Sequence, residues 1–218
     1  GPLRGSKGCT LEGGVREPTI ARWPGKIKAG SSSDAIAGTT DVLPTFVALA
    51  GGKVKTDVKI DGVDISPVLL GKAERSTREA WYYFQGNNLQ AVRSGAWKLA
   101  ISKQSIGMGM KEKPADLQKP GRLYNLDQEI GEVTDVAAEN PEVVARLKGM
   151  AEAMAAEIES NRRSAGSVEN PVTLYPSEAR NKKPKKRPAA ANKTPVDWKR
   201  VQVGDSFDSN RAPQIGGR

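Results

Sequence analysis

The chain has 218 residues, with 34 Lys and Arg against 25 Asp and Glu, so its formal net charge is +9. It contains no histidine and a single cysteine, Cys9, which excludes a Ser-His-Asp triad, an imidazole metal ligand and an internal disulfide within these residues. No stretch of 18 apolar residues predicts a membrane span. Residues 161–218 hold 13 Lys and Arg against 5 Asp and Glu, whereas residues 1–160 hold 21 against 20. We therefore expect a nearly neutral folded body followed by a basic tail.

The opening fourteen residues, GPLRGSKGCTLEGG, contain five glycines and predict a loop. Glycines allow backbone N–H groups to converge, and Lys7 with Arg4 adds positive charge, a composition that suits an anion site. The order of residues is neither GxxxxGK[ST] nor GxGxxG before a helix. Composition alone therefore leaves an anion site and a plain surface loop both open.

The next segments predict a strand and a helix. Residues 15–25 favour a short strand closed by a turn, and Pro18 restricts it to a sheet edge because proline has no N–H to donate. Residues 40–51 predict a helix with one apolar face, which Thr40 or Asp41 caps.

A β-rich block and a long helix follow. Four short strands are expected, at residues 80–85, 89–93, 96–101 and 122–126. Residues 102–121 are polar and predict an irregular segment. Residues 141–160 predict a helix with Asn140 as its N-cap and Pro141 at its first position. Its apolar stripe is Val143, Leu147, Met150, Met154 and Ile158. The pattern indicates a small antiparallel sheet with a helix packed on it.

Other chemistry-bearing residues have plainer interpretations. Cys9 has no histidine to activate it, so a small half-buried residue is the simpler interpretation than a nucleophile. The carboxylates lack calcium-loop spacing. The basic run 182–187 has no aromatic residue for base stacking, which leaves a solvated tail or a charge-driven polyanion site open, without specific nucleic-acid recognition.

Five segments together resemble the sulfatase family, in particular the C-terminal portion of formylglycine-dependent arylsulfatases of the A type. They are PLRGSKGCTLEGGVREPTIARWPGKIKAG (2–30), TTDVLPTFVALAGG (39–52), DGVDISPVLLG (61–71), LQAVRSGAWKLA (89–100) and RLYNLDQEIGEVTDVA (122–137). Their order and intervals also fit, and the resemblance covers roughly residues 1–160.

This resemblance implies an α/β fold class in three parts. Residues 1–72 would be the end of the large alkaline-phosphatase-like α/β domain. Residues 79–160 would be the small C-terminal subdomain, a four-stranded antiparallel sheet packed on a helix. Residues 161–218 would be a basic, disordered tail, because they hold too few large apolar residues to offset the chain entropy.

The resemblance also implies a function, the hydrolysis of sulfate esters. Lys7 falls on the family lysine that contacts the sulfate group, as both a catalytic and a substrate-binding residue. The family nucleophile is a formylglycine made from the cysteine of a C-x-P-x-R motif. Cys9 is followed by Thr-Leu-Glu-Gly, so this modification is not possible in this chain. The family metal is usually calcium, and its ligands lie outside this chain. We therefore expect these residues to be inactive alone.

The expected partner is a sulfate ester, including sulfated carbohydrate. Asn87 and Asn88 in the predicted hairpin are candidate substrate contacts, although a tight turn also favours Asn. Family members are commonly exported, which implies a periplasmic or extracellular location. The alternative function is a noncatalytic module whose basic tail binds a polyanion.

Overall fold

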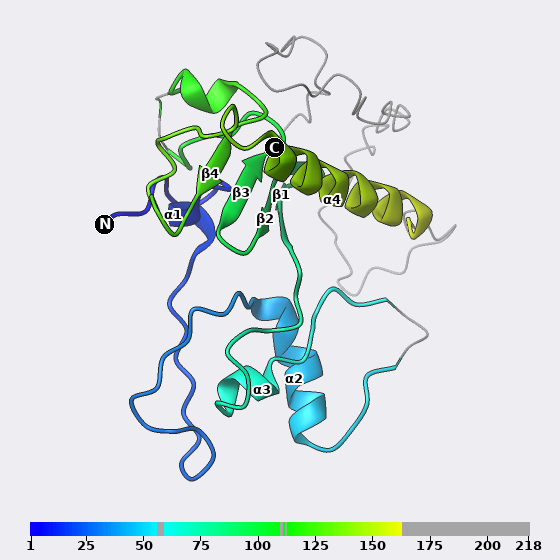
Figure 1. Ribbon diagram of the computed structural model, residues 1–218. Helices are drawn as coiled ribbons and strands as arrows, with labels where there is room; N and C mark the ends of the chain where they lie inside the picture. Colours follow the sequence, from blue (N-terminus) through cyan, green and yellow to red (C-terminus); the bar gives the residue numbers. More distant parts are fainter. Residues whose placement is uncertain (56–58, 110, 112, 163–218) are drawn as a thin grey trace, which may run out of the picture.

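The computed structural model describes residues 1–162 except 56–58, 110 and 112 (Figure 1). Nearly all of the predicted basic tail therefore lies outside the described residues. The elements are α1 (Glu12–Val15), η1 (Thr39–Asp41), α2 (Val42–Leu49), α3 (Ser66–Leu69), β1 (Trp81–Gln85), β2 (Asn88–Ser94), β3 (Trp97–Ala100), η2 (Asp116–Gln118), β4 (Leu123–Asn125) and α4 (Pro141–Ser160).

The four strands form one antiparallel sheet in the order β1-β2-β3-β4. Two-residue turns join β1 to β2 and β2 to β3, and each contains a glycine with positive φ, Gly86 (59°) and Gly95 (60°). Such tight hairpins need left-handed backbone that glycine adopts without strain. The predicted small sheet with its helix is confirmed, and the fold is consistent with the α/β class.

The sheet has two faces of different character. Val92, Leu99 and Leu123 are paired across the strands and pack against α4, forming the main apolar core. Successive strand residues point to opposite faces, so the neighbouring Lys98 faces away from α4. On that second face the sheet meets the N-terminal segment of the chain, which crosses it at α1 (Figure 1).

The long helix α4 has the predicted bounds but a different buried stripe. Val144, Leu147 and Ala151 are its buried residues, and Ile158 is 45% exposed. A helix of 20 residues extends about 30 Å, whereas β2 has 7 residues and spans about 23 Å. The helix therefore outruns the sheet at its C-terminal end, and the expectation that Ile158 is buried is wrong.

The predicted strand at residues 15–25 is also wrong. After α1 the chain is irregular and ends in a turn, and within the described part of the chain it pairs with no strand. Ile20 is 95% exposed. A strand requires a hydrogen-bonded neighbour, and Figure 1 shows this segment leading away from the sheet.

Helices α2 and α3 form a smaller unit apart from the sheet (Figure 1). Asp41 precedes α2 but does not cap it with its side chain. Its carboxylate instead accepts hydrogen bonds from the N–H groups of Gly38 and Val63, both at 2.8 Å, and pairs with Arg78. The Arg78 guanidinium also lies 4.6 Å from the centre of the Trp81 ring. This buried carboxylate therefore links α2 to the start of β1.

The apolar side of α2 is exposed, which leads to a prediction. Phe46 is 64% exposed, and Leu43 beside it is also exposed. Replacing Phe46 by Ser is expected to change the free energy of unfolding by no more than about 0.5 kcal/mol, as for other surface positions, and to reduce self-association. Chemical denaturation and light scattering measure the two effects. As a control, Leu147→Ala in the core should cost about 2–5 kcal/mol, and an equal loss for Phe46→Ser would contradict the exposure.

Candidate anion site and the buried charged cluster

Residues 4–13 form a closed loop with Lys7 at its exposed tip. The Gly13 N–H donates to the Arg4 carbonyl at 2.8 Å and brings the two ends together. A Cβ at Gly13 would lie 2.5 Å from the same oxygen, so only glycine permits this approach. Cys9 and Leu11 point inward and are buried, whereas Lys7 is exposed. Cys9 is thus a buried packing residue, more buried than expected.

The structure brings the β1–β2 hairpin to this loop. The Gln85 side-chain amide donates to the Gly8 carbonyl at 2.9 Å. Asn87 and Asn88 follow in the hairpin and are exposed, and the Asn88 amide donates to the Ser102 hydroxyl at 3.4 Å. The predicted site residues of the loop and the hairpin therefore come from neighbouring surface segments, joined through Gln85.

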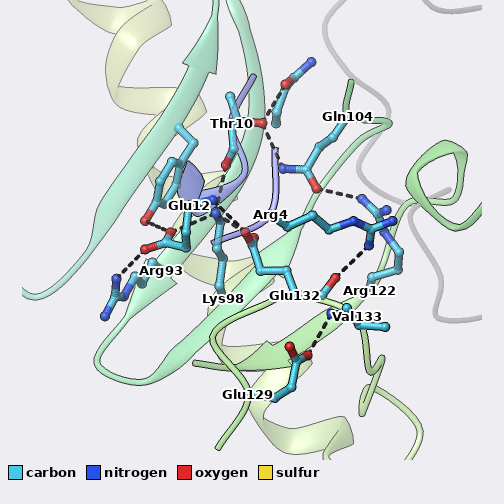
Figure 2. A network of polar contacts seen from close by, with 12 residues as sticks. Arg4, Thr10, Glu12, Arg93, Lys98, Gln104, Arg122, Glu129, Glu132 and Val133 are labelled. Carbon is cyan, nitrogen blue, oxygen red and sulfur yellow. Dashed lines mark hydrogen bonds and ion pairs between the residues drawn. The ribbon is translucent and has the colours of Figure 1, made fainter. Parts of the chain in front are cut away.

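Below the loop lies a charged cluster that centres on Lys98 (Figure 2). The Lys98 ammonium donates to the Thr10 carbonyl at 2.8 Å and to Glu12 at 2.9 Å. It also lies 2.8 Å from a carboxylate oxygen of Glu132. These three partners match the three N–H groups of an ammonium. All three charged side chains are at most 2% exposed.

Glu12 has further partners on the sheet. Its second carboxylate oxygen pairs with Arg93 at 2.9 Å, and the Tyr83 hydroxyl donates at 3.0 Å to the first oxygen, which also accepts from Lys98. The Lys98 ammonium lies 4.2 Å from the centre of the Tyr83 ring, a cation–π distance. Arg93, Lys98 and Tyr83 all belong to strands, so the sheet supplies the cations that hold this carboxylate.

Glu132 approaches from the loop after β4. It accepts a hydrogen bond from the Glu12 backbone N–H at 2.6 Å and is completely buried. Its φ is +53°, an uncommon left-handed conformation for a residue other than glycine. The ion pair with Lys98 and the bond to Glu12 hold the residue in this conformation.

The two buried carboxylates have pKa values shifted in opposite directions. Burial raises the pKa of Glu12, but the charge and hydrogen bond of Lys98 and the charge of Arg93 outweigh it, so this pKa lies below its ordinary value of 4.5. For Glu132, burial has the larger effect and Lys98 offsets only part of it. The pKa of Glu132 is therefore raised above 4.5.

These shifts predict opposite pH dependences for two matched variants. The stability contributed by Glu12 is present above its unfolded pKa and is lost as the pH falls through its folded pKa. That of Glu132 is complete below its unfolded pKa and is lost as the pH rises through its folded pKa. The stability advantage of the wild type over Glu12→Gln should shrink on acidification, and that over Glu132→Gln should grow. Denaturant unfolding from pH 3 to 7 measures both, and slopes of the same sign would contradict the assignment.

The described residues do not offer a calcium site. No group of three or more His, Cys, Asp or Glu side chains is placed to hold a metal among them. The buried carboxylates of Glu12, Glu132 and Asp41 already pair with cationic side chains. The part of the chain seen in the structure also contains no helix long and apolar enough to cross a membrane.

Sequence reasoning missed the cluster below the loop. Lys98 lies within the strand predicted at residues 96–101, and the sequence assigned no partner to Glu12. One signal was available, because Lys98 stands between apolar residues in the strand AWKLAI. A buried lysine requires a partner. The distance along the sequence between Lys98 and the carboxylates Glu12 and Glu132, however, does not identify which of them is that partner.

The chain is similar to known sulfatases. Residues 6–154 match the family described as N-sulphoglucosamine sulphohydrolase, C-terminal. Human arylsulfatase A is 36% identical over 167 residues, which cover 68% of this chain and 32% of that protein. Mouse N-acetylgalactosamine-6-sulfatase is 44% identical over 98 residues, which cover 45% of this chain and 18% of its own length. The chain thus spans a third or less of these relatives.

The chain is also similar to solved structures. The sulfatase PsFucS1 from Pseudoalteromonas sp. has a TM-score of 0.65 at 24% identity, over 75% of this chain and 34% of that one, and supports the fold alone. A structure described with the metabolism of multiple glycosaminoglycans by Bacteroides thetaiotaomicron has a TM-score of 0.59 at 29% identity. That match covers 69% of this chain and 31% of the other.

Proposed function

Since the chain belongs to the sulfatase family and matches its C-terminal region, we propose that it forms the C-terminal part of a sulfuric ester hydrolase in which Lys7 contacts the sulfate group. The observation that carries this proposal is the position of Lys7. It is an exposed lysine at the tip of a closed loop whose remaining side chains are bonded or packed beneath it. A positive charge at this position would stabilise the negative charge on the sulfate oxygens during ester cleavage.

We expect the substrate to be a sulfated carbohydrate. Two of the similar proteins are described with sugar sulfates or glycosaminoglycans, which supports this class. Asn87 and Asn88 are exposed in the hairpin that Gln85 ties to Gly8. Their amides can donate hydrogen bonds to sugar hydroxyls. In this proposal Lys7 binds the sulfate group and the hairpin contacts the sugar that carries it.

The nucleophile and the metal are not assigned to this chain. Cys9 is buried and lies outside a C-x-P-x-R motif, and no metal-ligand group occurs among the described side chains. The family calcium, whose ligands are expected outside this chain, is therefore not assigned to these residues. What this chain contributes is the placement of Lys7 and the hairpin.

The proposal predicts that the 218-residue chain by itself shows no turnover of a chromogenic aryl sulfate. The decisive test is a chimera in which residues 1–160 replace the matching third of an active arylsulfatase. The chimera should hydrolyse aryl sulfate, because the chain then supplies the lysine that the site needs. A folded chimera that binds metal and carries formylglycine but has no activity would contradict the proposal, as would turnover by the chain alone.

The charge of the tail favours a second candidate function, the binding of a polyanion. Residues 161–218 contain 13 Lys and Arg against 5 Asp and Glu. Such binding releases counterions and weakens steeply with salt. Affinity for a heparin-like polymer should fall between 50 and 200 mM salt by about tenfold or more and should disappear when residues 180–200 are deleted. Equal binding by the deletion variant would eliminate this candidate.

A further inference from the structure

The irregular segment between β3 and β4 contacts the Lys7 loop through residues 104–108 and 116–117. The Ser6 N–H donates to the Ile106 carbonyl at 3.0 Å, and the Met108 N–H donates to the Lys7 carbonyl at 2.7 Å. These two bonds fix the backbone of Lys7 and of the residue before it. The backbone of Lys7 is therefore held by hydrogen bonds, whereas the residue itself is exposed to solvent.

The same segment buries the inner side of the loop. Leu117 packs with Cys9 and Leu11 in a small apolar cluster, and Ile106 lies against it. This cluster is separate from the main core between the sheet and α4. Leu117 and Leu11 are fully buried. The apolar contacts of the loop are therefore supplied by this segment.

Polar contacts hold both ends of the loop. At one end, Arg4 donates to both carboxylate oxygens of Asp116, at 2.6 and 3.0 Å, and to the Glu132 carbonyl at 2.8 Å. At the other end, the Gln104 amide donates to the Thr10 hydroxyl at 2.8 Å. A bidentate guanidinium–carboxylate pair fixes orientation as well as distance.

We propose that the segment formed by Gln104, Ile106, Met108, Asp116 and Leu117 positions Lys7 for anion binding, with Asp116 acting through Arg4 as its main positioning residue. This inference rests on the proposed role of Lys7. The backbone that presents a sulfate-binding cation must be held in its productive place by its supporting residues. The segment that the sequence presented as an irregular connection supplies that support, although none of its residues is expected to touch the sulfate.

The buried thiol of Cys9 reports on the loop without any added label. It is the single cysteine of the chain and is 4% exposed. Alkylation therefore requires the loop to open. In the full 218-residue chain, Asp116→Asn is expected to raise the Cys9 alkylation rate about tenfold, which corresponds to about 1.4 kcal/mol of opening free energy. Asp116 is 43% exposed, so this variant should retain the fold. Asp116→Glu keeps the carboxylate and should restore most of the protection.

A second measurement follows the anion. Acetylation of Lys7, measured by mass spectrometry at constant ionic strength, should be slowed by inorganic sulfate in the wild type and much less in Asp116→Asn. Exposed Lys72 is the internal control. Hydrogen exchange of the β2 and β3 amides shows whether the sheet itself has loosened. Glu157→Gln, which removes an exposed ion pair with Lys59, is the matched control variant and should change neither reading.

The outcomes separate the two proposals. Faster Cys9 alkylation and lost sulfate protection, with unchanged exchange in the sheet, support the positioning role. An unchanged Cys9 rate overturns it, and so does a rise that is matched by equal loosening of the sheet. If sulfate does not protect Lys7 in the wild type, the proposed function fails, whereas the Cys9 rate still decides whether Asp116 holds the loop. Leu117→Ala offers an independent check, because it weakens the same loop through its apolar contact.

Discussion

Replacing Glu12 by Gln is expected to lower the free energy of unfolding by about 3–5 kcal/mol, the usual cost of breaking a buried ion pair by removing one partner. The neutral amide leaves Arg93 without its carboxylate and leaves Lys98 with the Glu132 carboxylate and the Thr10 carbonyl. It also presents an N–H donor to cations that have no lone pair to accept it. Urea denaturation at pH 7, followed by circular dichroism, measures the loss.

The exposed ion pair between Lys59 and Glu157 provides the control for this prediction. Its side chains are 57% and 37% exposed, so Glu157→Gln should cost no more than about 1 kcal/mol. Similar losses of unfolding free energy in the two variants would mean that the buried charged cluster does not stabilise the fold more than an exposed ion pair does. The comparison uses the same chemical change at both positions, so the difference reports burial and partners.

The second large effect is expected at Lys7. In the chimera described above, Lys7→Ala should lower kcat/KM for an aryl sulfate by about 10²-fold or more, by analogy with removing one charge-stabilising donor from an active site. The Lys7 side chain is exposed, so its loss should leave the free energy of unfolding nearly unchanged. Initial rates, together with denaturation of the same preparation, separate the effect on catalysis from an effect on folding.

Two further variants sharpen the test at Lys7. Lys7→Arg keeps the positive charge and should retain more activity than Lys7→Ala, but its planar guanidinium presents different donors, so full activity is not expected. Lys72→Ala removes an exposed lysine far along the chain and should have no effect. An unchanged rate for Lys7→Ala would remove Lys7 from the site.

The prediction was most accurate for the β-block and α4. Strands β1 to β4 and the helix α4 lie within one or two residues of their predicted bounds, because short apolar runs between glycine-containing turns and an amphipathic pattern that starts at Pro141 are local signals. The strand predicted at residues 15–25 was wrong because strand formation also depends on contacts that are not local in the sequence. Its apolar residues resemble a strand, but a strand also needs a neighbour, and the described part of the sheet provides none.

For the loop around Lys7, too, the sequence predicted the local features but not the contacts with distant residues. The motif segments in the sequence were sufficient to identify the family and to select Lys7 as the candidate anion contact. The division into domains at 1–72 and 79–160 remains a prediction, and residues 4–14 are bonded to the sheet of the second part through Glu12 and Lys98. The support of the loop by Asp116 and Leu117 was not predicted.

By itself, then, the sequence determined the strands of the sheet, helix α4, the glycine-rich loop and the family, because each depends on neighbouring residues or on a continuous motif. Only the tertiary structure decided that Glu12, Lys98 and Glu132 form one buried cluster, and that the segment before β4 packs against the Lys7 loop. The contacts of Glu12 with Lys98 and with Glu132 join residues that are 86 and 120 positions apart. Their strength comes from burial at low dielectric, which exists only after the chain has folded and excluded water.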